Sequence, residues 1–117
     1  MARVKRGTTV KAKHKKVLDR AKGYRGRAHK AYTVAKERTE KGMQYAYRDR
    51  RTKKREFRSL WIQRINAAVR PMGMTYSVFM GKALKMGLAL DRKTLAQLAF
   101  AEPESFKLIV EQVKAAA

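Results

Sequence analysis

The 117-residue sequence lacks cysteine and has only two prolines, one tryptophan and nine acidic residues. Without cysteine, disulfide bonds and cysteine-ligated metal sites are excluded, and nothing points to an oxidising compartment. No apolar run approaches the ~18–20 residues of a membrane-spanning helix, and the basic N-terminus lacks the apolar core of a signal peptide. Serine is absent before Ser59, whereas mitochondrial transit peptides are rich in it. We therefore expect a cytosolic chain that starts at Met1 or Ala2 and has no membrane partner.

Positive charge is abundant and is concentrated in one half of the chain. Residues 1–58 hold 22 Lys and Arg against five acidic residues, a balance of +17, whereas residues 59–117 hold eight against four, a balance of +4. A chain this short cannot neutralise +17 from within. The charge therefore predicts a polyanionic partner, and nucleic acid is the commonest one.

The second half, residues 59–117, has the apolar spacing of a compact domain of four short helices, the first being the end of a longer helix. Pro71 and Gly73 should end the first helix, Asp91 is well placed as the N-cap of the third, and Pro103 should open the fourth. No strand-like alternation is visible, so the predicted fold class is all-α. The side chains expected to face the core are Trp61, Ile65, Ala68, Val69, Met72, Tyr76, Phe79, Met80, Ala83, Leu84, Leu95, Leu98, Ala99, Phe106, Ile109, Val110 and Val113. Met74 and Met86, which cluster with Met72 and Met80 around the second helix, are also expected to pack in the core.

The first half, residues 1–58, is predicted to be a long basic helical extension without a core of its own. We expect an extended arm over residues 1–9, a short helix from Val10 to about Arg20, a bend at residues 22–27, and a long helix from about Arg27 to Arg70. The narrow apolar stripe of the long helix is made of small residues. This helix has no heptad repeat of large apolar residues, which argues against a coiled coil. A helix that is polar on every face needs a partner other than a protein core.

The most basic part of this extension is residues 48–58, where seven cations occupy eleven positions. Like charges then meet at i,i+3 and i,i+4, which destabilises an isolated helix. We therefore expect residues 1–55 to be largely disordered in the free chain and to become helical on RNA.

Aromatic residues interrupt the cationic stretch, and tyrosine and arginine can both stack on unpaired bases. For Phe57, close to Trp61 in sequence, packing within the protein is favoured. For Tyr24, packing and RNA contact both stay open. At the predicted start of the third helix, Arg92 and Lys93 are equally consistent with a phosphate site and with an ordinary exposed first turn.

No residue pattern supports catalysis. His14 and His29 are the only histidines, and without cysteine or nearby carboxylates they make a poor metal site. No serine lies near either histidine in sequence, and no phosphate-binding loop or paired carboxylates occur. We expect no enzymatic activity, no metal, no cofactor and no small-molecule substrate.

Three alternatives to RNA binding could also use a high positive charge. A basic address signal would account for a short run, but not for 22 cations over half a chain. A DNA-compacting architectural protein would use the same charge without reading RNA shape. A membrane-active basic helix would need a large apolar face that residues 1–58 lack.

Three segments carry a family resemblance: KGYRGR at residues 22–27, YAYRDRRTKKREFRSLWIQRINAAVR at 45–70, and LDRKTLAQLA at 90–99. They resemble the L-twenty family of bacterial large-subunit ribosomal proteins, and the similarity runs from end to end. It implies a helical extension threaded through 23S ribosomal RNA and a small helical domain on the outer side of the subunit. The implied function is early assembly of the large (50S) subunit. In some bacteria the family also represses translation of its own operon by binding the messenger RNA through the C-terminal domain. The implied partners are 23S ribosomal RNA, neighbouring large-subunit ribosomal proteins and that messenger RNA.

Charge, aromatic spacing and the resemblance together predict a set of RNA-binding residues along the chain. They are Arg3, Lys5, Arg6, Lys11, Lys13, His14, Lys15, Lys16, Arg20, Lys22, Tyr24, Arg25, Arg27, His29, Lys30, Tyr32, Arg48, Arg50, Arg51, Lys53, Lys54, Arg55, Arg58, Trp61, Arg64, Arg92 and Lys93.

Overall fold

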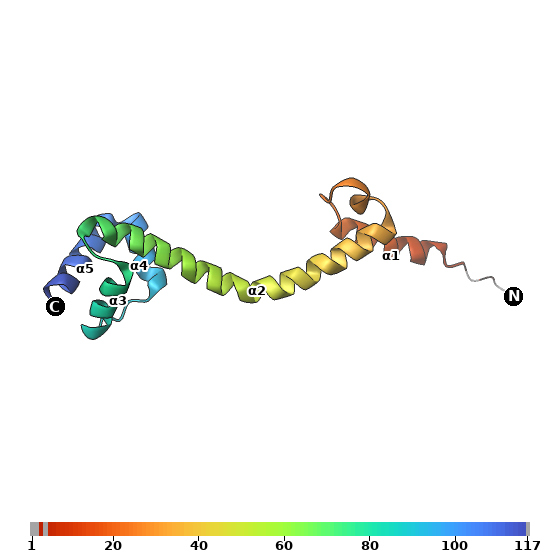
Figure 1. The fold of residues 1–117 in the computed structure, drawn as a ribbon. Coiled ribbons are helices and arrows are strands. Elements are labelled where there is room, and N and C mark those ends of the chain that lie inside the picture. The colour runs from red at the N-terminus through yellow and green to blue at the C-terminus, as the bar shows by residue number, and fades with distance from the viewer. Residues whose placement is uncertain (1–2, 4, 117) are drawn as a thin grey trace. The chain divides into compact units, whose positions relative to one another are not determined.

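A computed structural model describes Arg3 and residues 5–116, so the parts of the expected arm at positions 1, 2 and 4 lie outside the described residues. All regular structure in the described part is helical, which confirms the all-α class (Figure 1). The elements in chain order are α1 Gly7–Arg20, the 3₁₀ helix η1 Gly26–His29, α2 Tyr32–Val69, the 3₁₀ helix η2 Arg70–Met72, α3 Tyr76–Lys85, α4 Arg92–Ala101 and α5 Pro103–Ala115.

The chain forms two compact units, Met1–Arg51 (unit 1) and Thr52–Ala117 (unit 2), and α2 contributes to both. The sequence-based division after Arg58 stays a prediction. Helix α1 begins at Gly7 rather than Val10, so the described part of the arm is shorter than expected.

The long helix does not run unbroken from Arg27. The 3₁₀ turn η1 comes first, and Lys30 leaves helical geometry with a φ of −130° before α2 begins at Tyr32. At its other end α2 stops before Pro71, and Gly73 follows with a φ of +79°, a left-handed conformation that suits glycine. The predicted end of this helix is therefore confirmed.

Unit 1 has a small core, which corrects the expectation that the basic half has none. Ala21, at the end of α1, and Ala35, on α2, are completely buried, and Thr39 is nearly so. The Thr39 hydroxyl donates to the carbonyl oxygen of Ala35 at 2.8 Å, so its burial leaves the hydroxyl with a partner. The rings of His14 and Tyr32 stack with centroids 3.7 Å apart.

Small side chains in this core allow α1 and the first turns of α2 to meet locally. The charged ends of the long side chains stay in water. Whether these helices form before RNA binds stays a prediction.

Unit 2 has a helical core, which is made by the end of α2 with α3, α4 and α5. The rings of Phe79 and Phe106 lie at its centre with centroids 5.9 Å apart. Most of the side chains predicted to face the core do so. Those that are buried are Ile65, Val69, Phe79, Met80, Ala83, Leu95, Phe106, Val110 and Val113. Those that pack against the core while partly exposed are Trp61, Ala68, Met72, Tyr76, Leu98, Ala99 and Ile109.

One buried core residue, Ala96, was not among the predicted ones, whereas Met74 is buried as predicted. Met86, which was also expected in the core, is 38% exposed. Leu84 is also predicted to face the core, but the structure places it elsewhere, since it is 66% exposed. It follows the buried Ala83 on α3 and therefore points about 100° further round the helix, away from the core.

The predicted helix starts in unit 2 are confirmed. Asp91 is the N-cap of α4, because its carboxylate accepts a hydrogen bond from the Thr94 backbone N–H at 2.7 Å. Pro103 opens α5 at the first turn.

Candidate nucleic-acid interface

The cations of unit 1 lie on its surface and have few acidic partners. Every Lys and Arg of α1 is exposed, as are the described cations that precede it. Ion pairs in the described part of the chain join Lys22 to Asp19, at 3.5 Å, and Arg48 to Asp49, at 2.8 Å. Both are exposed pairs between near neighbours in sequence, and such pairs neutralise little of the surrounding field. Unit 1 therefore presents a positively charged surface that suits a polyanion.

The predicted bend lies at residues 21–31, between α1 and α2, and depends on two glycines. Gly23 and Gly26 have φ values of +89° and +63°, which are strained for other residues. Tyr24, between them, is 36% exposed, and its hydroxyl reaches α2 at Gly42. A Cβ atom at Gly42 would lie 3.0 Å from that hydroxyl oxygen, so the glycine permits the close approach. Tyr24 thus packs within the protein and still keeps part of its ring exposed.

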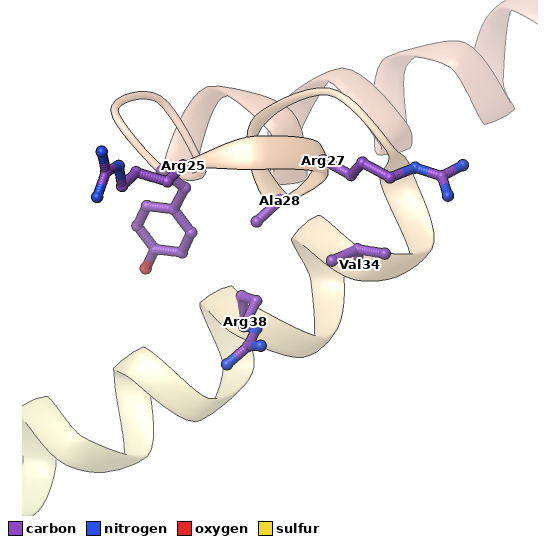
Figure 2. Close-up of a pocket in the computed structure, with 6 residues that line it drawn as sticks. Arg25, Arg27, Ala28, Val34 and Arg38 are labelled. Atoms are coloured by element: carbon purple, nitrogen blue, oxygen red, sulfur yellow. The ribbon is translucent and has the colours of Figure 1, made fainter.

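A hollow of about 410 Å³ lies between this bend and the first turns of α2 (Figure 2). The residues that line it are Tyr24, Arg25, Arg27, Ala28, Val34 and Arg38. Three of them belong to the predicted RNA-binding set. Arg38 does not, because it is distant in sequence from the bend and only the fold brings it there. The isolated Gly42 in a long helix was the one signal that another chain segment packs at this point of α2.

Farther along α2, two exposed tyrosines are covered by arginine side chains. The Arg51 guanidinium lies 4.0 Å from the centre of the Tyr47 ring and donates to the Tyr47 hydroxyl at 2.9 Å. The Arg48 guanidinium lies 4.7 Å from the Tyr45 ring centre. Such cation–π contacts hold flat aromatic and guanidinium groups side by side at the surface. These groups are able to stack on unpaired bases.

The ring of Phe57 contacts that of Trp61 with centroids 6.2 Å apart, as expected for packing within the protein, and the residue is still 44% exposed. Trp61 is itself partly buried against the core of unit 2.

The two histidines differ: His14 is half-buried in its stack with Tyr32, whereas His29 is exposed in η1. No group of metal-ligating side chains occurs in the described part of the chain.

The start of α4 is organised by hydrogen bonds. The Asp91 carboxylate accepts from both the hydroxyl and the backbone N–H of Thr94, and these bonds lower the pKa of Asp91 below its ordinary value. Arg92 donates through Nε to the Tyr76 hydroxyl at 2.8 Å, which ties α4 to α3. Lys93 is exposed. Of the two predicted cations here, Arg92 is therefore also a packing residue.

Sequence comparison decides what kind of protein carries this surface. The family model described as ribosomal protein L20 matches residues 3–109. The chain belongs to the ribosomal protein L20 family. This confirms the resemblance seen in the three sequence segments.

Relatives named "Large ribosomal subunit protein bL20" align with this L20 family chain over nearly its full length. The protein of Rhodospirillum centenum is 60% identical over 99% of this chain and 98% of its own. The protein of Pelagibacter ubique is 61% identical with the same coverage, and that of Magnetococcus marinus is 60% identical over 99% of both chains. None of the helices in the described part of the chain is long and apolar enough to cross a membrane.

Proposed function

We propose that this L20 family chain is a structural constituent of the large ribosomal subunit, that it binds 23S ribosomal RNA directly, and that it promotes early assembly of the subunit. Its place would be the cytoplasmic ribosome, beside other large-subunit proteins, and its role non-enzymatic. The observation that carries the proposal is the exposed cationic surface of unit 1, in a family whose relatives are named for the large subunit.

The mechanism follows from charge. RNA helices repel one another where their backbones converge, and cations placed between them lower that cost. Unit 1 supplies such cations on exposed helix faces, together with exposed tyrosines such as Tyr45 and Tyr47. Unit 2 is folded around its own core, so it offers a preformed surface that sets the register of binding. There, Trp61, Arg64 and Lys93 are the residues expected to meet RNA.

The experiment is a salt titration of binding to a 23S ribosomal RNA fragment. If about ten phosphates are neutralised, log K should fall with log salt at a slope of about −7 to −9. A slope near zero would refute the electrostatic mechanism. Co-purification with large subunits through a high-salt wash tests the location in the ribosome.

DNA compaction is the main alternative, because duplex DNA offers a similar density of phosphates. Exposed aromatic rings favour RNA, since stacking needs bases that are not paired. Competition separates the two: structured RNA should displace labelled RNA at lower concentrations than duplex DNA of equal length. Equal displacement would favour the DNA-compacting function.

Binding to its own messenger RNA through unit 2 is a further part of the proposal and rests on the family resemblance. Its test is a reporter that carries the leader of the protein's own operon. Repression by the intact protein supports it, and unchanged expression contradicts it.

A further inference from the structure

The hollow beside the bend has a composition that phosphate neutralisation alone does not explain. Its lining combines the Tyr24 ring and the apolar side chains of Ala28 and Val34 with three arginines. Figure 2 shows the side chains of Arg25 and Arg27 extending away from each other, on opposite sides of Ala28. An apolar floor between two cations suits a ligand that has a flat apolar body and a negative charge on either side.

A single unpaired nucleotide has this chemistry. Its base is flat and stacks on aromatic rings, and its chain carries one phosphate on each side. A free phosphate needs no apolar floor, and a regular duplex keeps its bases stacked inside, out of reach of a hollow. The volume of about 410 Å³ lies within the range of small-molecule sites.

The charged lining also discriminates between bases. A guanidinium carries five N–H donors and no acceptor, and no carboxylate lines the hollow. Arg38 makes no hydrogen bond or ion pair within the described part of the chain, so its donors are available. Guanine presents two adjacent acceptors, O6 and N7, that a guanidinium binds bidentately, whereas adenine presents its N6 amino donor beside N7.

We infer that the hollow lined by Tyr24, Ala28, Val34 and Arg38 binds one unpaired guanosine of RNA. The base lies against the Tyr24 ring and the apolar floor, the Arg38 guanidinium donates to O6 and N7, and Arg25 and Arg27 contact the flanking phosphates. The contact of the Tyr24 hydroxyl with α2 at Gly42 holds the ring in place before the base arrives. This inference rests on the proposed RNA binding and adds a specificity to it.

The test uses the full-length protein and RNA hairpins of one stem sequence, either without a bulge or with a single bulged G, A, U or C. Binding is measured by fluorescence anisotropy at one salt concentration. The bulged-G hairpin is expected to bind about 5- to 150-fold more tightly than the bulged-A hairpin, the range for one bidentate base contact.

The decisive variant is Arg38→Ala, which removes the donors to O6 and N7; lysine is not used here because it can also donate to both atoms. Arg38→Ala should abolish the preference for bulged G over bulged A. Arg50→Ala is the matched control, because it removes the same charge on α2 outside the hollow; it should weaken binding of every hairpin alike and keep the preference.

Equal affinity for bulged G and bulged A would overturn the inference, and so would a G preference that survives Arg38→Ala. A preference lost equally in Arg50→Ala would overturn the assignment to this hollow. If the protein binds the bulge-free hairpin with a steep salt dependence but ignores the bulge, only this inference fails. If it binds none of the hairpins in a salt-dependent way, the proposed function fails as well.

Discussion

Phe106 provides a direct test of whether unit 2 acts as a folded platform. Its side chain is 2% exposed and its ring lies 5.9 Å from that of Phe79, at the centre of the core. Phe106→Ala removes the whole ring and is expected to cost about 3–5 kcal/mol in the free energy of unfolding. A unit of this size is stable by only about 3–10 kcal/mol, at roughly 0.05–0.15 kcal/mol per residue. The substitution should therefore remove much or all of the stability of unit 2.

Trp61 is a suitable reporter, because it is the only tryptophan and packs partly buried against the core of unit 2. Its fluorescence is followed during urea unfolding of the wild type, Phe106→Ala and a control, Leu108→Ala. Leu108 lies on the same helix, α5, but is 62% exposed. We expect a large loss of stability for Phe106→Ala and little change for Leu108→Ala.

The same variants separate the two kinds of RNA binding. In Phe106→Ala, salt-dependent binding through the exposed cations of unit 1 should persist, whereas the contribution of the folded surface of unit 2 should be lost. The platform role is refuted if both variants unfold at the wild-type urea concentration. It is also refuted if Phe106→Ala unfolds unit 2 and RNA binding stays unaltered in affinity and in salt slope.

Three further predictions concern the bend, the start of α4 and the basic half. Gly42→Ala should gain up to about 1 kcal/mol of helix propensity, but the new methyl group meets the Tyr24 hydroxyl. The double variant Gly42→Ala, Tyr24→Phe removes that hydroxyl, so it should melt at a higher temperature than Gly42→Ala alone. Equal melting temperatures would contradict the contact. Because hydrogen bonds from Thr94 lower the pKa of Asp91, the stability that this carboxylate contributes is present above the ordinary pKa of about 3.8 and is lost as the pH falls through the lower, folded-state pKa. In Asp91→Asn, the melting temperature of unit 2 should lose this part of its dependence on acid pH. The same pH profile in the variant and the wild type would contradict a stabilising role of the Asp91 carboxylate. Deletion of residues 1–51 should abolish incorporation into large subunits in sucrose gradients and leave weaker RNA binding with a shallower salt slope, whereas full incorporation would show that unit 1 is dispensable.

The helical fold class and several helix ends are well predicted from sequence, because these depend on neighbouring residues. Asp91 caps α4 through a residue three positions away, and Pro103 can open a helix but cannot continue one. The prediction for Leu84 is wrong, because helical spacing identifies an apolar stripe but not its edge. That edge depends on which surfaces the neighbouring helices cover.

The sequence by itself determined that this chain is helical, strongly basic and unevenly charged, and these properties are what predict a polyanionic partner. Net charge is a sum over residues and helix formation depends mainly on neighbours in sequence, so neither requires knowledge of distant contacts. Only the tertiary structure decided that Ala21 and Ala35 make a core for the basic half, and that Arg38 lines the same hollow as Tyr24. Both depend on α1 and the bend folding back onto α2, where small side chains and Gly42 permit a close approach. Separation in sequence gives no measure of such contacts, because they form only where two surfaces fit.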